Sequence, residues 1–163
     1  MRFMLVFSLC ISFFLLLCFG CSQANTTSNM AAKDLPTENQ ELANSFYKQM
    51  QIVNQLMEEL DLIIVELQKT DELEEAIEIL ETAKNEVKEI VVLLETIRPE
   101  NNRLAKFISS YKKELLHYVE GLRLQIAGME TWDSEKTTEG YKRTEIAKKN
   151  LKQYNNQFKD TFL

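Results

Sequence analysis

Apolar residues recur at steps of three and four positions along the chain after residue 36, a spacing typical of one face of an α-helix. The first helix is expected over about residues 38–69. Its apolar positions are Leu42, Phe46, Met50, Val53, Leu56, Met57, Leu60, Ile63, Ile64 and Leu67. The second stripe consists of Leu73, Ala76, Ile77, Leu80, Ala83, Val87, Ile90, Val91, Leu94 and Ile97. Neither helix should be stable alone, because helix stability comes mostly from packing of the apolar face.

Two further stripes follow, and they are richer in aromatic residues. The third is made of Leu104, Phe107, Ile108, Tyr111, Leu115, Tyr118, Val119, Leu122, Ile126 and Met129. The fourth is made of Tyr141, Thr144, Ala147, Leu151, Tyr154, Phe158 and Phe162. Residues 130–140, "ETWDSEKTTEG", are the longest interruption between them and predict a long connection. Around Pro99, either a tight hairpin or a kink in one very long helix would fit the sequence.

Four amphipathic segments of similar length, with few glycines and prolines, predict an all-α fold. We expect an up-and-down bundle of about four helices after a signal peptide and a flexible tether. A long antiparallel coiled coil that forms a dimer is the alternative, because the heptad spacing of Phe46, Val53, Leu60 and Leu67 suits both arrangements. Gly121 and Gly128, seven residues apart, are expected to let a neighbouring helix approach the third helix closely.

The beginning of the chain is its most apolar part. Arg2 precedes a run from Phe3 to Gly20 without a charged residue, which is the pattern of an export signal. The run is about 18 residues long and a membrane-spanning helix needs roughly 20, so its length also allows an uncleaved anchor. Arg2 would keep the start of the chain in the cytoplasm and place the rest outside the membrane.

The end of this run, Leu17-Cys18-Phe19-Gly20-Cys21, resembles the lipobox of bacterial lipoproteins. Gly20 fits the family pattern, whereas Cys18 and Phe19 stand where a leucine and a small residue are usual. The resemblance implies that a peptidase cuts before Cys21 and that its sulfur carries a diacylglyceryl group. Two acyl chains anchor a protein stably, so we expect a lipid-anchored protein on the extracytoplasmic side of the cell membrane. In a cell with two membranes, the outer membrane is an alternative destination.

These features divide the chain into three parts. Residues 1–20 are the expected signal peptide, and residues 21–35 are the lipidated cysteine followed by a flexible tether of small polar residues. Residues 36–163 are the expected helical domain. All three cysteines lie at or before position 21, so this domain has no disulfide and must be stabilised by packing.

The charge of the chain argues against nucleic acid as a partner. Without the signal peptide it has 18 basic and 25 acidic residues, and nucleic-acid affinity depends largely on neutralising phosphates with basic side chains. The charge is uneven, with ten acidic and three basic residues over 71–100. Two interpretations stay open: an acidic face for a cationic partner, or acidic and basic helices that lie side by side within the fold.

No motif indicates catalysis, a cofactor or a metal centre. Glu114 and His117 form a Glu-x-x-His pattern, and di-iron bundles use two such motifs. His117 is the only histidine of the chain, so a single chain cannot build that site, and only a site shared across a dimer would remain. With Cys21 blocked by lipid there is no nucleophilic cysteine, and four glycines supply no phosphate-binding loop. We therefore expect a protein that is not an enzyme.

Aromatic side chains near the interruption at 130–140 are the candidate partner surface. Trp132, Tyr141 and Tyr118 would supply it, because aromatic residues are enriched at binding surfaces; the alternative is that they fill the core. The expected function is a surface- or periplasm-exposed lipoprotein with a non-catalytic binding or scaffolding domain for a protein or cell-envelope partner. Two alternatives are a self-associating coiled-coil spacer, which would be a homodimer, and a protein that binds a cell-wall polymer.

Overall fold

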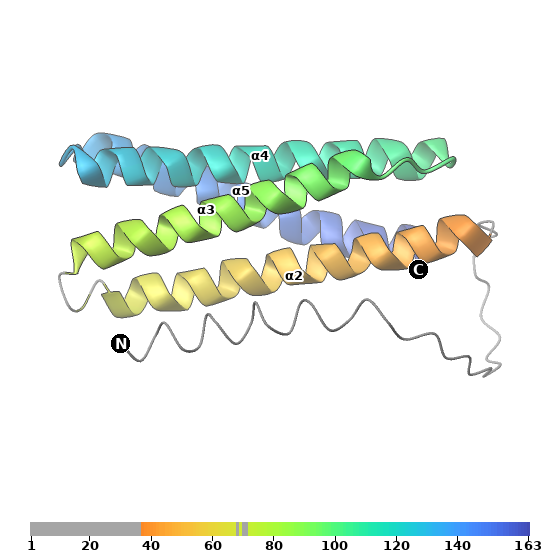
Figure 1. The fold of residues 1–163 in the computed structure, drawn as a ribbon, viewed down its shortest axis with the longest axis horizontal. Coiled ribbons are helices and arrows are strands. Elements are labelled where there is room, and N and C mark those ends of the chain that lie inside the picture. The colour runs from red at the N-terminus through yellow and green to blue at the C-terminus, as the bar shows by residue number, and fades with distance from the viewer. Residues whose placement is uncertain (1–36, 68, 70–71) are drawn as a thin grey trace. The chain divides into compact units, whose positions relative to one another are not determined.

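The computed structural model describes residues 37–67, 69 and 72–163 of the chain. The predicted signal peptide, the lipidation site at Cys21 and the tether lie outside the described residues. The described part consists of four helices, which are α2 (Thr37–Leu67), α3 (Leu73–Thr96), α4 (Asn102–Glu130) and α5 (Ser134–Phe162). Each helix packs against the next along the chain, and α5 also packs against α2. The predicted all-α, up-and-down bundle is therefore confirmed (Figure 1).

The segment around Pro99 is a tight hairpin and not a kink. Helix α3 ends at Thr96, α4 begins at Asn102, and the two helices pack against each other. Asn101 caps the start of α4, because its side-chain Oδ1 accepts hydrogen bonds from the backbone N–H of Arg103 at 2.9 Å and of Leu104 at 3.0 Å. Proline and a capping asparagine together stop one helix and start the next.

The long connection predicted over residues 130–140 is wrong, because only three residues separate α4 from α5. The side-chain Oδ1 of Asp133 accepts a hydrogen bond from the backbone N–H of Lys136 at 2.9 Å and so caps α5. The first two turns of α5 lack an apolar stripe because Thr137 and Gly140, not large apolar residues, lie against α4. Hydrophobic periodicity therefore could not reveal them.

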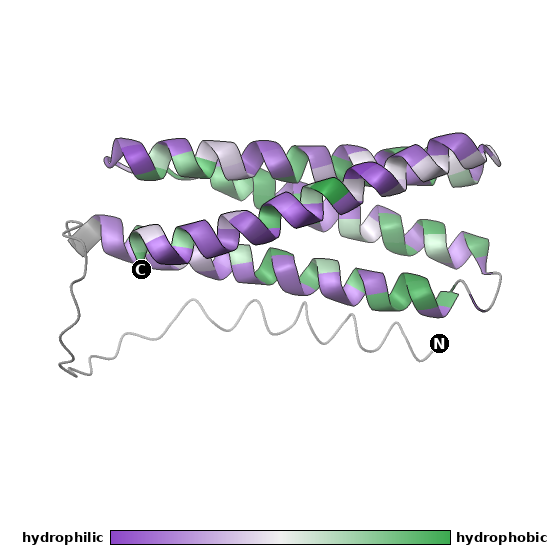
Figure 2. Cartoon of the chain, turned by 180° about the vertical axis from the view of Figure 1, so that it is seen from behind, coloured by the Kyte–Doolittle hydropathy of each residue, from purple (hydrophilic) through white to green (hydrophobic). Residues whose placement is uncertain are grey.

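The apolar faces of the four helices meet in one core (Figure 2). Of the four heptad positions, Phe46, Val53 and Leu60 are buried in the core and Leu67 is partly buried. One end of this core is an aromatic cluster, with ring centroids 4.9–6.3 Å apart and mostly edge-to-face. Its members come from α2, α4 and α5, and they are Phe46, Tyr47, Phe107, Tyr111, Tyr154, Phe158 and Phe162.

Glycines allow α4 and α5 to pack with their backbones close together. A Cβ atom added at Gly121 would lie 2.6 Å from the Cγ2 of Thr144, and one added at Gly140 would lie 2.5 Å from the backbone N of Gln125. Gly128 faces Thr137 in the same way. The prediction that Gly121 and Gly128 permit a close helix approach is therefore confirmed.

Candidate functional site

The three aromatic residues of the predicted partner surface differ in their exposure to solvent. The side chain of Tyr118 is only 1% exposed, so the prediction that it belongs to a surface is wrong. Tyr118 lies on the core-facing stripe of α4, and burial, followed by the charges of Asp61 and Glu145, raises the pKa of its hydroxyl. Trp132 and Tyr141 are 84% and 56% exposed, and they remain candidates for a partner surface.

Trp132 occupies a backbone position that usually belongs to glycine. It follows the last residues of α4 with a φ of 54°, and it is the only non-glycine residue of the described chain with a positive φ. Its N–H donates to the carbonyl of Met129 at 3.3 Å, and the N–H of Asp133 donates to the carbonyl of Gly128 at 2.8 Å. These two bonds form a Schellman motif, in which the left-handed residue is commonly glycine.

The backbone conformation of Trp132 lowers the stability of the fold, and packing of its side chain does not offset this loss. A left-handed backbone costs a residue with a Cβ about 1–2 kcal/mol. A buried tryptophan could offset this cost through its large apolar area, but Trp132 is exposed over most of its surface. Strain of this kind is commonly retained where a side chain has a function, so Trp132 is the first residue of the candidate site.

Replacing Trp132 with glycine is expected to raise the free energy of unfolding by about 1 kcal/mol, because glycine adopts a positive φ without a steric penalty. Trp132→Ala keeps a Cβ and therefore keeps the strain, so it serves as the matched control. Chemical denaturation followed by far-UV circular dichroism measures both variants. A glycine variant no more stable than the alanine variant would mean that the turn is not strained.

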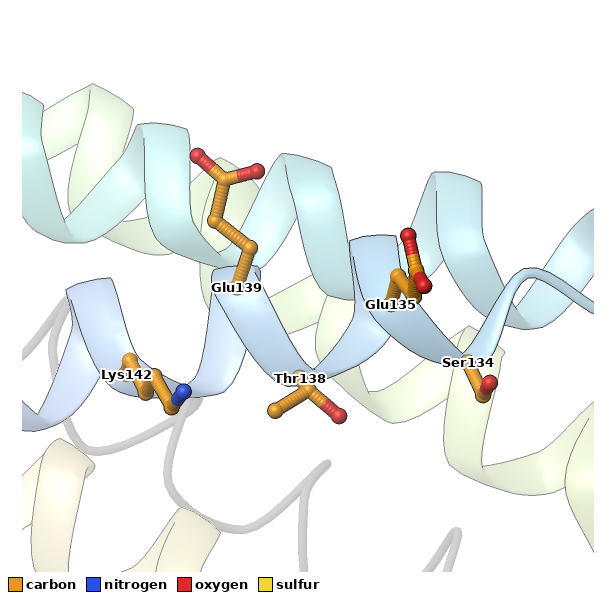
Figure 3. Close-up of a pocket in the computed structure, with 5 residues that line it drawn as sticks. All are labelled: Ser134, Glu135, Thr138, Glu139 and Lys142. Carbon is orange, nitrogen blue, oxygen red and sulfur yellow. The ribbon is translucent and has the colours of Figure 1, made fainter.

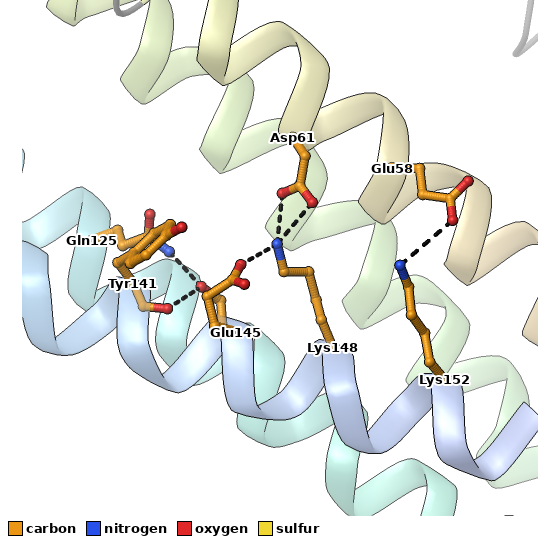
Figure 4. A network of polar contacts seen from close by, with 8 residues as sticks. Glu58, Asp61, Gln125, Tyr141, Glu145, Lys148 and Lys152 are labelled. Atoms are coloured by element: carbon orange, nitrogen blue, oxygen red, sulfur yellow. Dashed lines mark hydrogen bonds and ion pairs between the residues drawn. The ribbon is translucent and has the colours of Figure 1, made fainter.

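Helices α2 and α5 lie close at one end of the bundle and separate toward the other. We call the end that holds the turn at Trp132 the distal end, and the end that holds the start of α2 the proximal end. Near the proximal end, the rings of Tyr47 and Phe158 stack with centroids 5.9 Å apart. From there toward the distal end, α5 runs away from α2 (Figures 1 and 4).

Polar contacts hold α2 and α5 together where they begin to separate. The Nζ of Lys148 lies 2.7 Å from a carboxylate oxygen of Asp61 and also pairs with Glu145 (Figure 4). Partial burial alone would lower the pKa of Lys148, but the hydrogen bonds to these two carboxylates outweigh it and raise the pKa above its usual range. One turn nearer the proximal end, Lys152 pairs with Glu58 at 3.6 Å.

Beyond these ion pairs, both helices expose apolar side chains. Leu62 and Val65 on α2 are 69% and 52% exposed, and Tyr141 on α5 is also exposed. Val65 lies one turn beyond Asp61, and Tyr141 lies two turns beyond Lys148 in the distal direction, so each is on the same side of its helix as the ion-paired residue. Sequence reasoning missed Leu62 and Val65, although the run "LIIV" is apolar on every side of the helix.

The described residues contain no arrangement typical of an active site. One surface hollow, of about 330 Å³, is lined by residues of α5 alone, whose side chains point in different directions: Ser134, Glu135, Thr138, Glu139 and Lys142 (Figure 3). His117 is largely exposed, with its Nδ1 3.5 Å from the Oε2 of Glu114. Within the part of the chain that the structure describes, no three metal-ligating side chains come together.

Two further observations bear on function. Among the helices of residues 37–67 and 72–163, none combines the length and the apolarity that a membrane span requires. Comparisons with protein-family models, with curated proteins and with solved structures give no match for this chain. The residue of the described chain that most strongly indicates a function is the exposed, strained Trp132.

Proposed function

We propose that this chain is a membrane-anchored lipoprotein whose helical bundle is a non-catalytic binding domain for a protein partner. The anchor would be a lipid on Cys21, which the resemblance of residues 17–21 to a lipobox supports. The binding role is carried by one observation. Trp132 is exposed and held in a backbone conformation that glycine would adopt at lower cost.

The topology of the bundle suits this role. The expected tether precedes α2, so it joins the chain to the proximal end of the bundle. Trp132 is at the distal end, and α4 with its 29 residues spans about 43 Å between the two ends at 1.5 Å per residue. A bundle anchored through Cys21 would thus present Trp132 at the end that lies away from its attachment point.

The proposal is tested on the chain purified from its own cells after crosslinking within those cells. Mass spectrometry should find an N-terminal peptide that starts at Cys21 with a diacylglyceryl mass, because cleavage before that residue is expected. It should also find a crosslinked protein that is lost in Trp132→Gly, although that variant is the more stable one. An N-terminal peptide that still contains residues 3–20 would show an uncleaved anchor and contradict the lipoprotein.

The other outcomes separate the alternative functions. Crosslinks only between copies of this chain would favour a self-associating spacer over a binding domain. Sedimentation of the purified chain with cell walls, lost in Trp132→Gly, would favour a polymer-binding protein. Val92→Ser is the control for Trp132→Gly in the crosslinking and sedimentation experiments, because Val92 is a 61% exposed apolar residue of α3 in the proximal half of the bundle.

A further inference from the structure

Resting on the proposed function, we infer that the distal end of the bundle binds a basic, amphipathic segment of the partner protein. We call this region the distal surface. Its apolar part consists of the exposed side chains of Leu62 and Val65 of α2, Trp132 of the turn and Tyr141 of α5, and most charged residues of this end are acidic. The inference is carried by two properties of the described residues: large apolar side chains left exposed, and a strong excess of negative charge.

The apolar side chains of the distal surface are each more than half exposed to solvent. Leu62 and Val65 follow Asp61 on α2 in the distal direction, and Tyr141 lies on the part of α5 that has moved away from α2 (Figure 4). Nearer the proximal end, the residues of α2 and α5 that face each other form ion pairs and stacked rings. Apolar residues exposed in a group and rimmed by charges commonly mark a site of protein association.

The charges of the bundle differ between its two ends. Residues 58–67, 69, 72–78 and 130–145 at the distal end include 13 acidic and four basic side chains. Residues 39–50, 92–106 and 152–163 at the proximal end include four acidic and six basic side chains. Acidic and basic residues are therefore separated along the length of the bundle, in addition to any difference between neighbouring helices.

Two acidic side chains at the start of α3 lie close together. Glu72 and Glu75 are near enough to share a hydrogen bond, which raises the pKa of Glu75 above its usual range. Lys and Arg side chains of a partner would relieve this repulsion, and they also bind favourably over the face of an exposed tryptophan. A DNA or RNA backbone or an anionic lipid surface would instead be repelled.

An amphipathic basic segment satisfies both properties of the distal surface. Its apolar residues would cover Leu62, Val65 and Tyr141, as in complexes where a helix lies along an apolar groove. Its basic residues would face the acidic rim, which favours rapid association and selects against acidic partners.

Binding of defined peptides tests the inference directly. The probe is an amphipathic helical peptide of leucine and lysine, compared with a peptide of equal length in which glutamate replaces lysine. Both are titrated into the full chain in nonionic detergent, with the fluorescence of Trp132 as the signal, since it is the only tryptophan of the chain. We expect the lysine peptide to bind at least about tenfold more tightly, and to weaken as salt is added.

Variants show whether the distal surface is the site. Val65→Ser should weaken binding of the lysine peptide by about fivefold, because it removes buried apolar area from the complex. The control Val92→Ser, at a similarly exposed valine, should leave the affinity within about twofold. Equal affinity for the two peptides, no binding of either, or equal losses in the two variants would each overturn the inference.

A crosslinking experiment in cells separates this inference from the proposed function. A photoreactive amino acid replaces Leu62 in one strain and Val92 in another, and the crosslinked peptides of the partner are sequenced. Crosslinks from position 62 to a segment rich in Lys and Arg support the inference. Crosslinks from position 62 to an acidic segment, or from position 92 alone, overturn it but leave a protein-binding function intact. No crosslinked protein from either position overturns both.

Discussion

Replacing Phe158 with alanine is expected to lower the free energy of unfolding by about 4 kcal/mol. The ring of Phe158 is fully buried and lies 5.2 Å, between centroids, from both Phe46 of α2 and Phe107 of α4. It also stacks with Tyr47 and contacts Phe162. Deleting it removes contacts with two other helices at once and leaves a cavity among rigid rings, which cannot collapse easily.

Denaturation by urea, followed by circular dichroism, measures this effect. Trp132→Ala is a suitable control, because it removes a still larger aromatic side chain from an exposed position and should change the stability by less than about 1 kcal/mol. If Phe158→Ala costs no more than the control, the aromatic cluster does not hold the proximal end together. In that case the seam between α2 and α5 would depend on its ion pairs.

The aromatic cluster is important for the whole bundle because the ion pairs between α2 and α5 are weak. Ion pairs on a surface contribute little stability, typically 0–1 kcal/mol each, and the carboxylates of Asp61 and Glu58 are both more than half exposed. The side chain of Asn155, a buried residue of α5, has no hydrogen-bond partner in the described part of the chain. Aromatic packing at the proximal end therefore contributes more to the attachment of α2 to α5 than these ion pairs do.

The periodicity of apolar residues was sufficient to predict the architecture. Every residue of the third stripe, from Leu104 to Met129, lies on α4, and its members are buried or packed against the core. The close approach at Gly121 and Gly128 was also readable, because glycine acts through local backbone chemistry. At Pro99 the sequence indicated an interruption of the helix but left a hairpin and a kink equally open. A pattern that reports burial thus identifies helices and the faces that meet.

The candidate site was less predictable, for physical reasons that differ between residues. Tyr118 and Trp132 are both aromatic, and composition cannot tell a ring in the core from a ring in solvent. The left-handed backbone of Trp132 follows from the three-residue turn, whose length the sequence did not reveal. Exposure of Leu62 and Val65 depends on the separation of α5 from α2, which is a property of the packed bundle.

Replacing Gly140 with alanine is expected to lower the free energy of unfolding by about 2 kcal/mol, although helix propensity alone predicts a gain of about 1 kcal/mol. The new Cβ would lie 2.5 Å from the backbone N of Gln125 and 2.7 Å from the backbone O of Gly121. Backbone atoms within a helix cannot rotate away as a side chain can, so α4 and α5 would have to move apart along their whole contact.

Thr138→Ala is the matched control for this prediction, because Thr138 is exposed on the same turn of α5 and alanine there improves only the helix propensity. The control should be slightly stabilised, by about 0.5 kcal/mol, while Gly140→Ala is destabilised in the same urea titration. Opposite signs for two alanines two residues apart would show that the contact between α4 and α5 depends on the absence of a side chain. A gain in stability from both would mean that these helices have room to spare, and that propensity decides the outcome.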